Sequence, residues 1–290
     1  MNPAREILYK IAVSGVPERV LDAVPALEHQ AYRQALRYVA GRDREDAFST
    51  VRALAGDGLR ASIDLFGEQV SDPVQAAQAC NGYVDLAGAL TGLPGTTSIS
   101  IDLSHIGLDI SIQLCADYLQ RITAALPEWC RLEVGAEDST RTDSILDLSL
   151  AAAASGARVM QTVQANLRRS PDDVLRLIEM KVPVRLVKGA YVESPDVALP
   201  WGRETDSAFV ALADTLHRAG HDVALATHDA GLREALLLVM PECEVQMLLG
   251  VLPDEAHALV ARGRGVRVYV PYGRNWARYW MRRLAESSGT

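Results

Sequence analysis

A tyrosine, two arginines and a glutamate near the end of the chain could bind a small anion. Tyr279, Arg282, Arg283 and Glu286 are spaced at i, i+3, i+4 and i+7, so a helix over this segment puts them on one face. Guanidinium groups offer paired donors that match a carboxylate. The segment therefore predicts a carboxylate site beside a phenol ring. Taken alone, the same spacing is more typical of a solvated helix stripe.

The elements that must position this face alternate along the chain. Apolar, β-branched runs lie at 59–65, 97–103, 131–134, 158–163, 184–187, 222–226, 244–248 and 266–270. Helix candidates follow them at 73–90, 108–126, 143–154, 171–181, 206–219, 230–239, 253–262 and 276–286. This alternation predicts a (β/α)8 barrel of the TIM type, with a doubly wound open sheet as the rival. We expect a barrel catalytic domain over residues 57–290 and an N-terminal helical arm over 1–56.

Polar residues gather where the predicted strands end. They occupy positions 64–68, 102–105, 161–164, 188–191 and 227–229, together with Gln246 and Tyr269. Active sites of such barrels lie at the carboxyl ends of the strands. The pattern therefore predicts a small-molecule enzyme whose site combines these residues with the arginine face.

Composition excludes several other classes of function. The 290 residues carry 29 basic and 37 acidic side chains, for a net charge of −8, which argues against nucleic-acid binding. No apolar run reaches the roughly 20 residues of a membrane span. Four cysteines without a CxxC pair, and no signal peptide, fit a cytoplasmic protein. No His, Asp and Glu spacing suggests a metal site.

Six motifs, in order and at this spacing, resemble the proline dehydrogenase family, flavoenzymes built on a distorted (β/α)8 barrel. They are Leu-Phe-Gly-Glu at 65–68, Val-Gln-Ala-Asn-Leu-Arg-Arg-Ser at 163–170, Val-Arg-Leu-Val-Lys-Gly-Ala-Tyr at 184–191, Ala-Thr-His-Asp at 226–229, Val-Gln-Met-Leu-Leu-Gly at 245–250 and Tyr-x-x-Arg-Arg-x-x-Glu at 279–286. The resemblance covers nearly everything from residue 59 to residue 286.

The resemblance implies FAD as the cofactor, lying across the carboxyl-terminal mouth of the barrel. No GxGxxG follows a strand, so a Rossmann-type flavin site is not expected. By the same resemblance, Arg185 lies near the flavin ring and Gln164 hydrogen-bonds nearby. The rest of the flavin site would be formed by Lys188, Gly189, Ala190, Thr227 and His228.

For the substrate, the resemblance implies that Arg282 and Arg283 clamp a carboxylate and that Glu68 holds one of them in place. The walls around an apolar ring would be Leu186, Tyr191, Tyr269 and Tyr279. The implied reaction is oxidation of L-proline or a related cyclic amino acid by hydride transfer to flavin N5, giving pyrroline-5-carboxylate from proline. The implied electron acceptor is a quinone, with at most peripheral contact with the inner membrane. Arg185, Tyr269, Arg282, Arg283 and Glu68 are the candidate catalytic residues.

Two positions depart from the family pattern. Asp102 stands where the family has a lysine that joins the arginines at the substrate carboxylate. Gly135 stands where the family has an aspartate. An anion beside a substrate carboxylate would repel it by about 1–4 kcal/mol. We therefore expect Asp102 to contact the substrate and free L-proline to be oxidised poorly.

Three alternatives stay open. A related flavoenzyme could act on a modified or carrier-bound prolyl group in a biosynthetic pathway. A flavin-free barrel lyase could use Lys188 as a Schiff-base amine. A degenerate barrel could bind flavin or another ligand without turnover.

Overall fold

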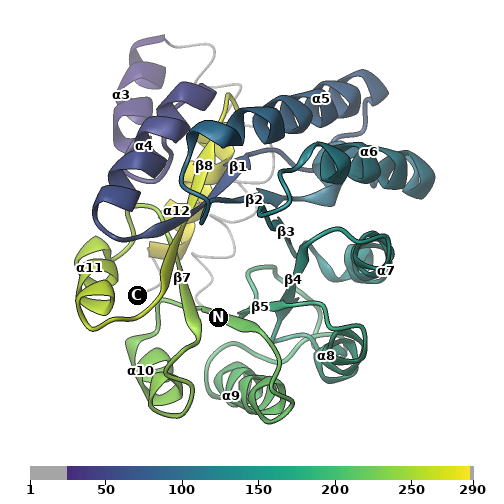
Figure 1. Ribbon diagram of the computed structural model, residues 1–290, viewed down its shortest axis with the longest axis vertical. Helices are drawn as coiled ribbons and strands as arrows, with labels where there is room; N and C mark the ends of the chain where they lie inside the picture. Colours follow the sequence, from purple (N-terminus) through teal and green to yellow (C-terminus); the bar gives the residue numbers. More distant parts are fainter. Residues whose placement is uncertain (1–24, 288–290) are drawn as a thin grey trace.

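The strands close into a barrel. The computed structural model describes residues 25–287 and the side chains of residues 27–284, so residues 1–24 of the expected arm and the side chain of Glu286 lie outside the described residues. The parallel strands pair in sequence order, and the last pairs with the first (Figure 1). They are β1 (Arg60–Leu65), β2 (Ser98–Ile101), β3 (Leu132–Val134), β4 (Val159–Gln164), β5 (Val184–Val187), β6 (Val223–Ala226), β7 (Glu244–Leu248) and β8 (Val266–Tyr272). The predicted (β/α)8 barrel is confirmed, and the rival open sheet is wrong.

Helices form the outer layer around the strands (Figure 1). They are α5 (Pro73–Ala89), α6 (Ile112–Ala125), α7 (Thr142–Ala154), α8 (Ser170–Glu179), α9 (Arg203–Arg218), α10 (Ala230–Val239) and α11 (Pro253–Ala261). Asp72, Ser111 and Asp229 accept backbone N–H groups as the N-caps of α5, α6 and α10. Within the described part of the chain, no helix is long and apolar enough to cross a membrane.

The largest difference from the predicted elements lies after β2. The expected strand over 97–103 ends at Ile101, and a short 3₁₀ helix, η2 (Leu103–Ile106), follows it. Gly107 ends η2 with a φ of 97°, a backbone conformation that favours glycine. As a result α6 begins at Ile112 rather than 108, and Asp102 lies in the bend between strand and 3₁₀ helix.

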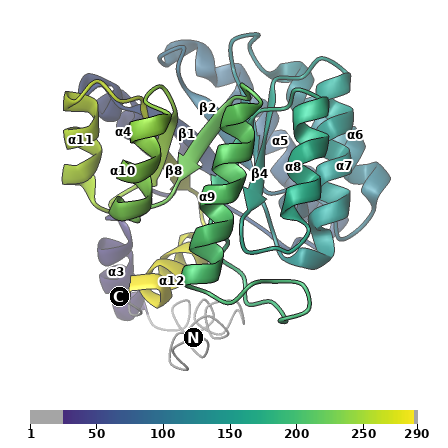
Figure 2. The ribbon, with the colours of Figure 1, turned by 90° about the horizontal axis from the view of Figure 1, so that it is seen from below.

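Within residues 25–287, three further α-helices lie outside the ring of helices from α5 to α11. α4 (Arg44–Gly56) contributes Ala47, Phe48 and Val51 to the main hydrophobic core. α3 (Pro25–Ala35) packs with α12 (Trp276–Ser287) in a second, smaller core. Figure 2 shows α3 and α12 together at one end of the barrel. The domain boundary at residue 56 stays a prediction.

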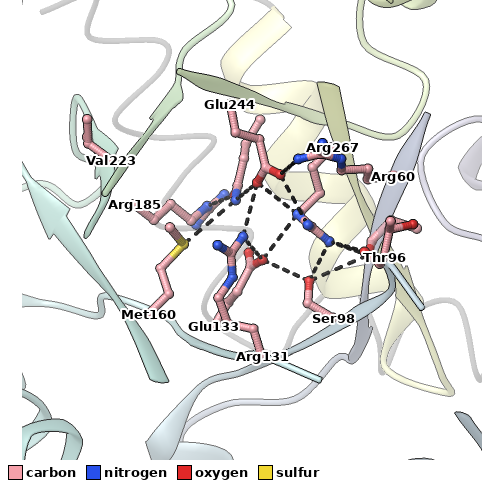
Figure 3. A network of polar contacts seen from close by, with 12 residues as sticks. Arg60, Thr96, Ser98, Arg131, Glu133, Met160, Arg185, Val223, Glu244 and Arg267 are labelled. Carbon is pink, nitrogen blue, oxygen red and sulfur yellow. Dashed lines mark hydrogen bonds and ion pairs between the residues drawn. The ribbon is translucent and has the colours of Figure 1, made fainter. Parts of the chain in front are cut away.

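Charged side chains fill the interior of the barrel near the amino-terminal ends of the strands. Arg267 lies 7% exposed as a side chain and donates in a fork to Glu244, at 2.8 and 3.1 Å. Arg131 also reaches Glu244, at 3.0 Å, and Glu133, at 3.0 Å (Figure 3). Because these ions pair with one another, their burial is compensated. We call Arg131, Glu133, Glu244 and Arg267 the interior charge network. The exposed Arg60 pairs with Glu244 at 2.9 Å at its edge.

Candidate functional site

A cavity of about 470 Å³ lies at the carboxyl ends of the strands, between them and α12. Nearly all of the predicted site residues line it. They are Asp102, Gln164, Arg185, Lys188, Gly189, Ala190, Tyr191, Thr227, His228, Tyr269, Tyr279, Arg282 and Arg283. The position follows from the fold, because parallel barrel strands all present their carboxyl ends at one mouth.

Two predicted site residues, Leu186 and Glu68, do not line the cavity. Leu186 belongs to the packing outside the strands. It is fully buried in the main hydrophobic core, whereas its neighbours Arg185 and Val187 line the cavity. Side chains alternate between the two faces of a strand, so Leu186 faces the helical layer. The prediction that Leu186 forms a wall of the substrate site is therefore corrected.

Glu68 lies behind the cavity rather than in its lining. Its Oε1 is 2.7 Å from Arg282 Nη2 and 3.7 Å from Arg278 Nη1. Both Glu68 and Arg282 are buried. A buried carboxylate at this distance fixes the guanidinium group in orientation as well as position. Glu68 is therefore positioned to hold Arg282 in place.

Aromatic rings surround the two arginines. The Arg283 guanidinium lies over the ring of Tyr279, 4.9 Å from its centroid, and that of Arg282 lies 5.8 Å from the centroid of Tyr191. Tyr269 and Tyr279 lie with their ring centroids 5.9 Å apart. Such contacts stabilise the cations while leaving their edges able to donate. The site thus joins anion binding with apolar walls.

Asp64, at the end of β1, holds the hydroxyl group of Tyr269. The Tyr269 hydroxyl donates to one oxygen of Asp64, and Tyr83 donates to the other at 2.9 Å. Burial raises the pKa of Asp64 to about 6, although both tyrosine hydrogen bonds oppose the rise. The aromatic wall formed by Tyr269 is therefore fixed from below by a buried carboxyl group.

Arg185 is connected to the interior charge network through an amide. Its Nε donates to Gln246 Oε1 at 2.7 Å, and Gln246 Nε2 donates to Glu244 Oε1 at 3.0 Å. The two ends of the Gln246 amide differ in donor and acceptor character, so these partners fix its orientation. Gln246 thereby holds Arg185 at the floor of the cavity.

Lys188 is held by two carboxylates. Its Nζ lies 2.6 Å from Asp206 Oδ1 and 2.8 Å from Asp229 Oδ2. Burial alone would lower the pKa of Lys188, but the two carboxylates outweigh it and raise the pKa. Lys188 therefore stays charged at neutral pH.

Gly189 and His228 occupy constrained positions beside Lys188. Gly189 has a φ of 113°, and a Cβ there would lie 2.0 Å from Asn166 Oδ1, so only glycine fits. His228 Nε2 accepts a hydrogen bond from the Leu248 amide at 3.1 Å. Burial, followed by the nearby Arg283, lowers the pKa of His228 to about 4. The neutral ring therefore carries its proton on Nδ1, which remains a donor.

Asp102 and Gly135 face each other across the ends of β2 and β3. The Gly135 amide donates to Ile101 O at 2.8 Å, and a Cβ on Gly135 would lie 1.9 Å from Asp102 Oδ1. The absence of a side chain at 135 therefore makes the room that the Asp102 carboxyl group occupies. The two departures from the family pattern form one local arrangement.

Ser100, Trp201 and Leu248 line the cavity but lay outside the predicted set. Trp201 comes from the long loop between β5 and α9, which carries no recognisable motif. Gln246, expected among the polar residues at the strand ends, does line the cavity. Among the described residues, no group of three or more His, Cys, Asp or Glu side chains is placed to hold a metal ion.

Comparison with known proteins gives a consistent family. The sequence profile described as proline dehydrogenase matches residues 47–290. The chain is 33% identical to proline dehydrogenase 1 of Bacillus subtilis subsp. natto over 87% of this chain and 86% of that protein. It is 32% identical to the proline dehydrogenase of Deinococcus radiodurans over 97% and 94%.

The fold has a close counterpart in a larger protein. Proline utilization A from Bdellovibrio bacteriovorus, in a crystal structure of the form inactivated by N-propargylglycine, superposes with a TM-score of 0.82 at 20% identity. The match covers 91% of this chain but only 34% of that one, so this chain spans about a third of the larger protein. At this identity the likeness concerns the fold alone. The sequence matches carry the family: the chain belongs to the proline dehydrogenase family of oxidoreductases.

Proposed function

We propose that the chain binds FAD in the cavity and oxidises L-proline or a closely related cyclic amino acid to the cyclic imine. One observation carries this proposal. A single cavity holds Arg282 and Arg283, suited to a substrate carboxylate, together with Arg185 and Lys188, suited to an anionic cofactor. The family membership supplies the reaction class.

The residues present fit a flavin. Arg185 and the amide of Gln164 offer a cation and a hydrogen-bonding group for the polar edge of a ring system, and both line the cavity. Gln164 is itself fixed, because its Nε2 donates to Glu137 O at 2.8 Å. Lys188, Gly189, Ala190, Thr227 and His228 add a cation, backbone and side-chain donors on the adjoining wall. The donor set is therefore rich in groups that bind phosphate and carbonyl oxygens.

The chemistry divides between cofactor and chain. Residues such as Arg185 and Gln164 would hold FAD, which would supply a hydride acceptor for the carbon next to the ring nitrogen of the substrate. Arg282 and Arg283 hold the substrate carboxylate, and Tyr269 and Tyr279 enclose the apolar ring. Arg185, fixed by Gln246, would supply a positive charge to a flavin ring held in this cavity as that ring becomes anionic. These side chains orient the substrate and exclude water around it.

The first test is spectroscopic. The purified protein should be yellow, release non-covalent FAD on denaturation, and lose its visible absorbance when a cyclic amino acid is added without an electron acceptor. The measurement is the absorbance spectrum before and after addition of L-proline, with acyclic N-methylalanine as the control. A colourless protein that takes up no FAD on reconstitution would disprove the proposal.

The downstream acceptor and location are part of the proposal but rest on the family resemblance alone. We propose that a quinone is the electron acceptor. We also propose that the protein is cytoplasmic and makes at most peripheral contact with the inner membrane. Reduction of a soluble quinone analogue, cell fractionation and co-sedimentation with lipid vesicles test these points.

The Schiff-base lyase is disfavoured by the state of Lys188. A nucleophilic lysine needs a lowered pKa, whereas Asp206 and Asp229 raise the pKa of this one. Borohydride treatment in the presence of pyruvate or another small carbonyl compound should therefore add no mass to the protein. A stable adduct on a peptide that contains Lys188 would revive the lyase.

A further inference from the structure

Four carboxyl groups gather near the ends of β1, β2 and β3, and three of them have partners. Asp64 accepts from Tyr83 and Tyr269, and Glu68 pairs with Arg282. Glu137 accepts from the Ser104 amide at 2.9 Å. The side chain of Asp102, the fourth, makes no hydrogen bond or ion pair with another residue in the described part of the chain. It also lines the cavity.

The geometry around Asp102 keeps its carboxyl group available to a ligand. Asp102 stands at the N-cap position of η2, yet its side chain caps no backbone amide there. Gly135 leaves open the space into which the carboxyl group extends. A polar group in such a site stays unsatisfied when an apolar ligand covers it, which costs free energy. A ligand with a hydrogen-bonding group opposite Asp102 should therefore bind better than an apolar one.

Building on the proposed function, we propose that Asp102 hydrogen-bonds a hydroxyl or amino substituent on the substrate ring, so that the site selects a substituted cyclic amino acid over proline. The substituent is distinct from the ring nitrogen. That nitrogen must lose its proton before the imine forms, and a carboxylate that held it as an ammonium would oppose this loss. Arg282 and Arg283 bind the carboxylate, and Asp102 hydrogen-bonds a second polar group elsewhere on the ring.

The protonation of Asp102 supports this role and changes the expected repulsion. Burial, then the neighbouring Glu137, Asp64 and Glu68, raise the pKa of Asp102 well above its usual range, while Arg282 opposes the rise. A raised pKa favours the neutral carboxyl group, which both donates and accepts hydrogen bonds. A neutral group does not repel a substrate carboxylate. The electrostatic repulsion expected for free proline is thus reduced. The main cost of binding proline is then that the Asp102 carboxyl group is left without a hydrogen-bond partner.

The experiment compares substrates in matched variants. We measure kcat/KM for L-proline, the cis and trans isomers of 4-hydroxy-L-proline, 3-hydroxy-L-proline and 4-amino-L-proline in the holoenzyme. The wild type should prefer at least one substituted ring over proline by about tenfold or more. Asp102→Leu should abolish this preference, whereas Asp102→Asn, which keeps hydrogen bonding, should retain part of it. A preference for 4-amino-L-proline over the hydroxylated rings identifies an ammonium as the group that Asp102 reads.

Gly135→Ala provides a second perturbation that leaves Asp102 chemically intact. Its Cβ would displace the Asp102 carboxyl group, so it should reduce the preference in the same direction. Asp109→Asn is the control, because Asp109 pairs with Arg141 at 2.7 Å and lies outside the cavity lining. It should leave the substrate ratio unchanged.

The outcomes separate this inference from the proposed function. Efficient oxidation of L-proline, with a substrate ratio that Asp102→Leu does not move, overturns the role of Asp102 and leaves the proposed function standing. An equal loss for all substrates in Asp102→Asn assigns Asp102 to the reacting nitrogen instead, and also overturns the inference. Failure to bind FAD or to oxidise any of these amino acids defeats both proposals together.

Discussion

Replacing Arg282 with alanine is expected to lower kcat/KM for the cyclic amino acid roughly 30- to 700-fold, with FAD content unchanged. This corresponds to a loss of about 2–4 kcal/mol of transition-state stabilisation. Arg282 lines the cavity while Glu68 holds its Nη2 at 2.7 Å, so its donors are already oriented before substrate arrives. Arg283→Ala should give a loss in the same range, since that guanidinium is also held, over the ring of Tyr279. Steady-state kinetics and the ratio of flavin to protein absorbance provide the measurement.

Two companion variants and one unfolding measurement sharpen this result. Arg262→Ala is the matched control, because Arg262 pairs with Glu234 on the surface at 2.8 Å and should leave kcat/KM unchanged. Glu68→Gln should do partial damage, roughly tenfold or less, mainly in KM. Urea unfolding of Arg282→Ala distinguishes a lost clamp from lost structure, because Arg278, 3.7 Å from Glu68 in the wild type, is left to pair with that carboxylate. Unchanged turnover in both arginine variants would rule the clamp out.

Strand and helix alternation predicted a parallel sheet covered by helices, because each apolar run must be buried on both faces. It left an open sheet as the rival, and the pairing of β8 with β1 decides for the barrel. The ends of the strands were less predictable where local hydrogen bonds replace the hydrogen bonds between strands. After Ile101 the chain turns into η2, and the signals for this, Gly107 and the Ser111 cap, lie several residues downstream. β8 runs to Tyr272, past the expected end at 270, because its last residues pair with β1.

The site was predictable to the extent that strand ends meet at one mouth. Leu186 shows a rule that was available and not applied: once Arg185 faces the interior, the period of two sends Leu186 outward. The Gln246 link was not predictable, because it depends on which end of an amide meets Arg185 and which meets Glu244. The contact between Asp102 and Gly135 depends on the register of β2 against β3.

Replacing Glu244 with glutamine is expected to destabilise the protein by about 3–5 kcal/mol at pH 7. Glu244 is the anion that Arg60, Arg131 and Arg267 share, at 2.8 to 3.0 Å. Without its charge, Glu133 alone faces the buried Arg267 and Arg131. Urea unfolding measures the loss. Asp214→Asn, which breaks a surface pair with Arg218 at 2.9 Å, should cost about 0–1 kcal/mol and serves as the control.

The pH dependence of this loss tests whether charge is its cause. Burial would raise the pKa of Glu244, but Arg267 and then Arg131 outweigh it and lower the pKa to about 2. A carboxylate with a lowered pKa stabilises the fold above its unfolded pKa of about 4.3, and this stabilisation is lost as the pH falls toward 2. The stability difference between wild type and Glu244→Gln should therefore be constant from pH 7 to about 5 and shrink by roughly 3 kcal/mol below that. A difference that stays constant down to pH 3 would mean that shape and hydrogen bonding, rather than the charge of Glu244, hold the interior network together.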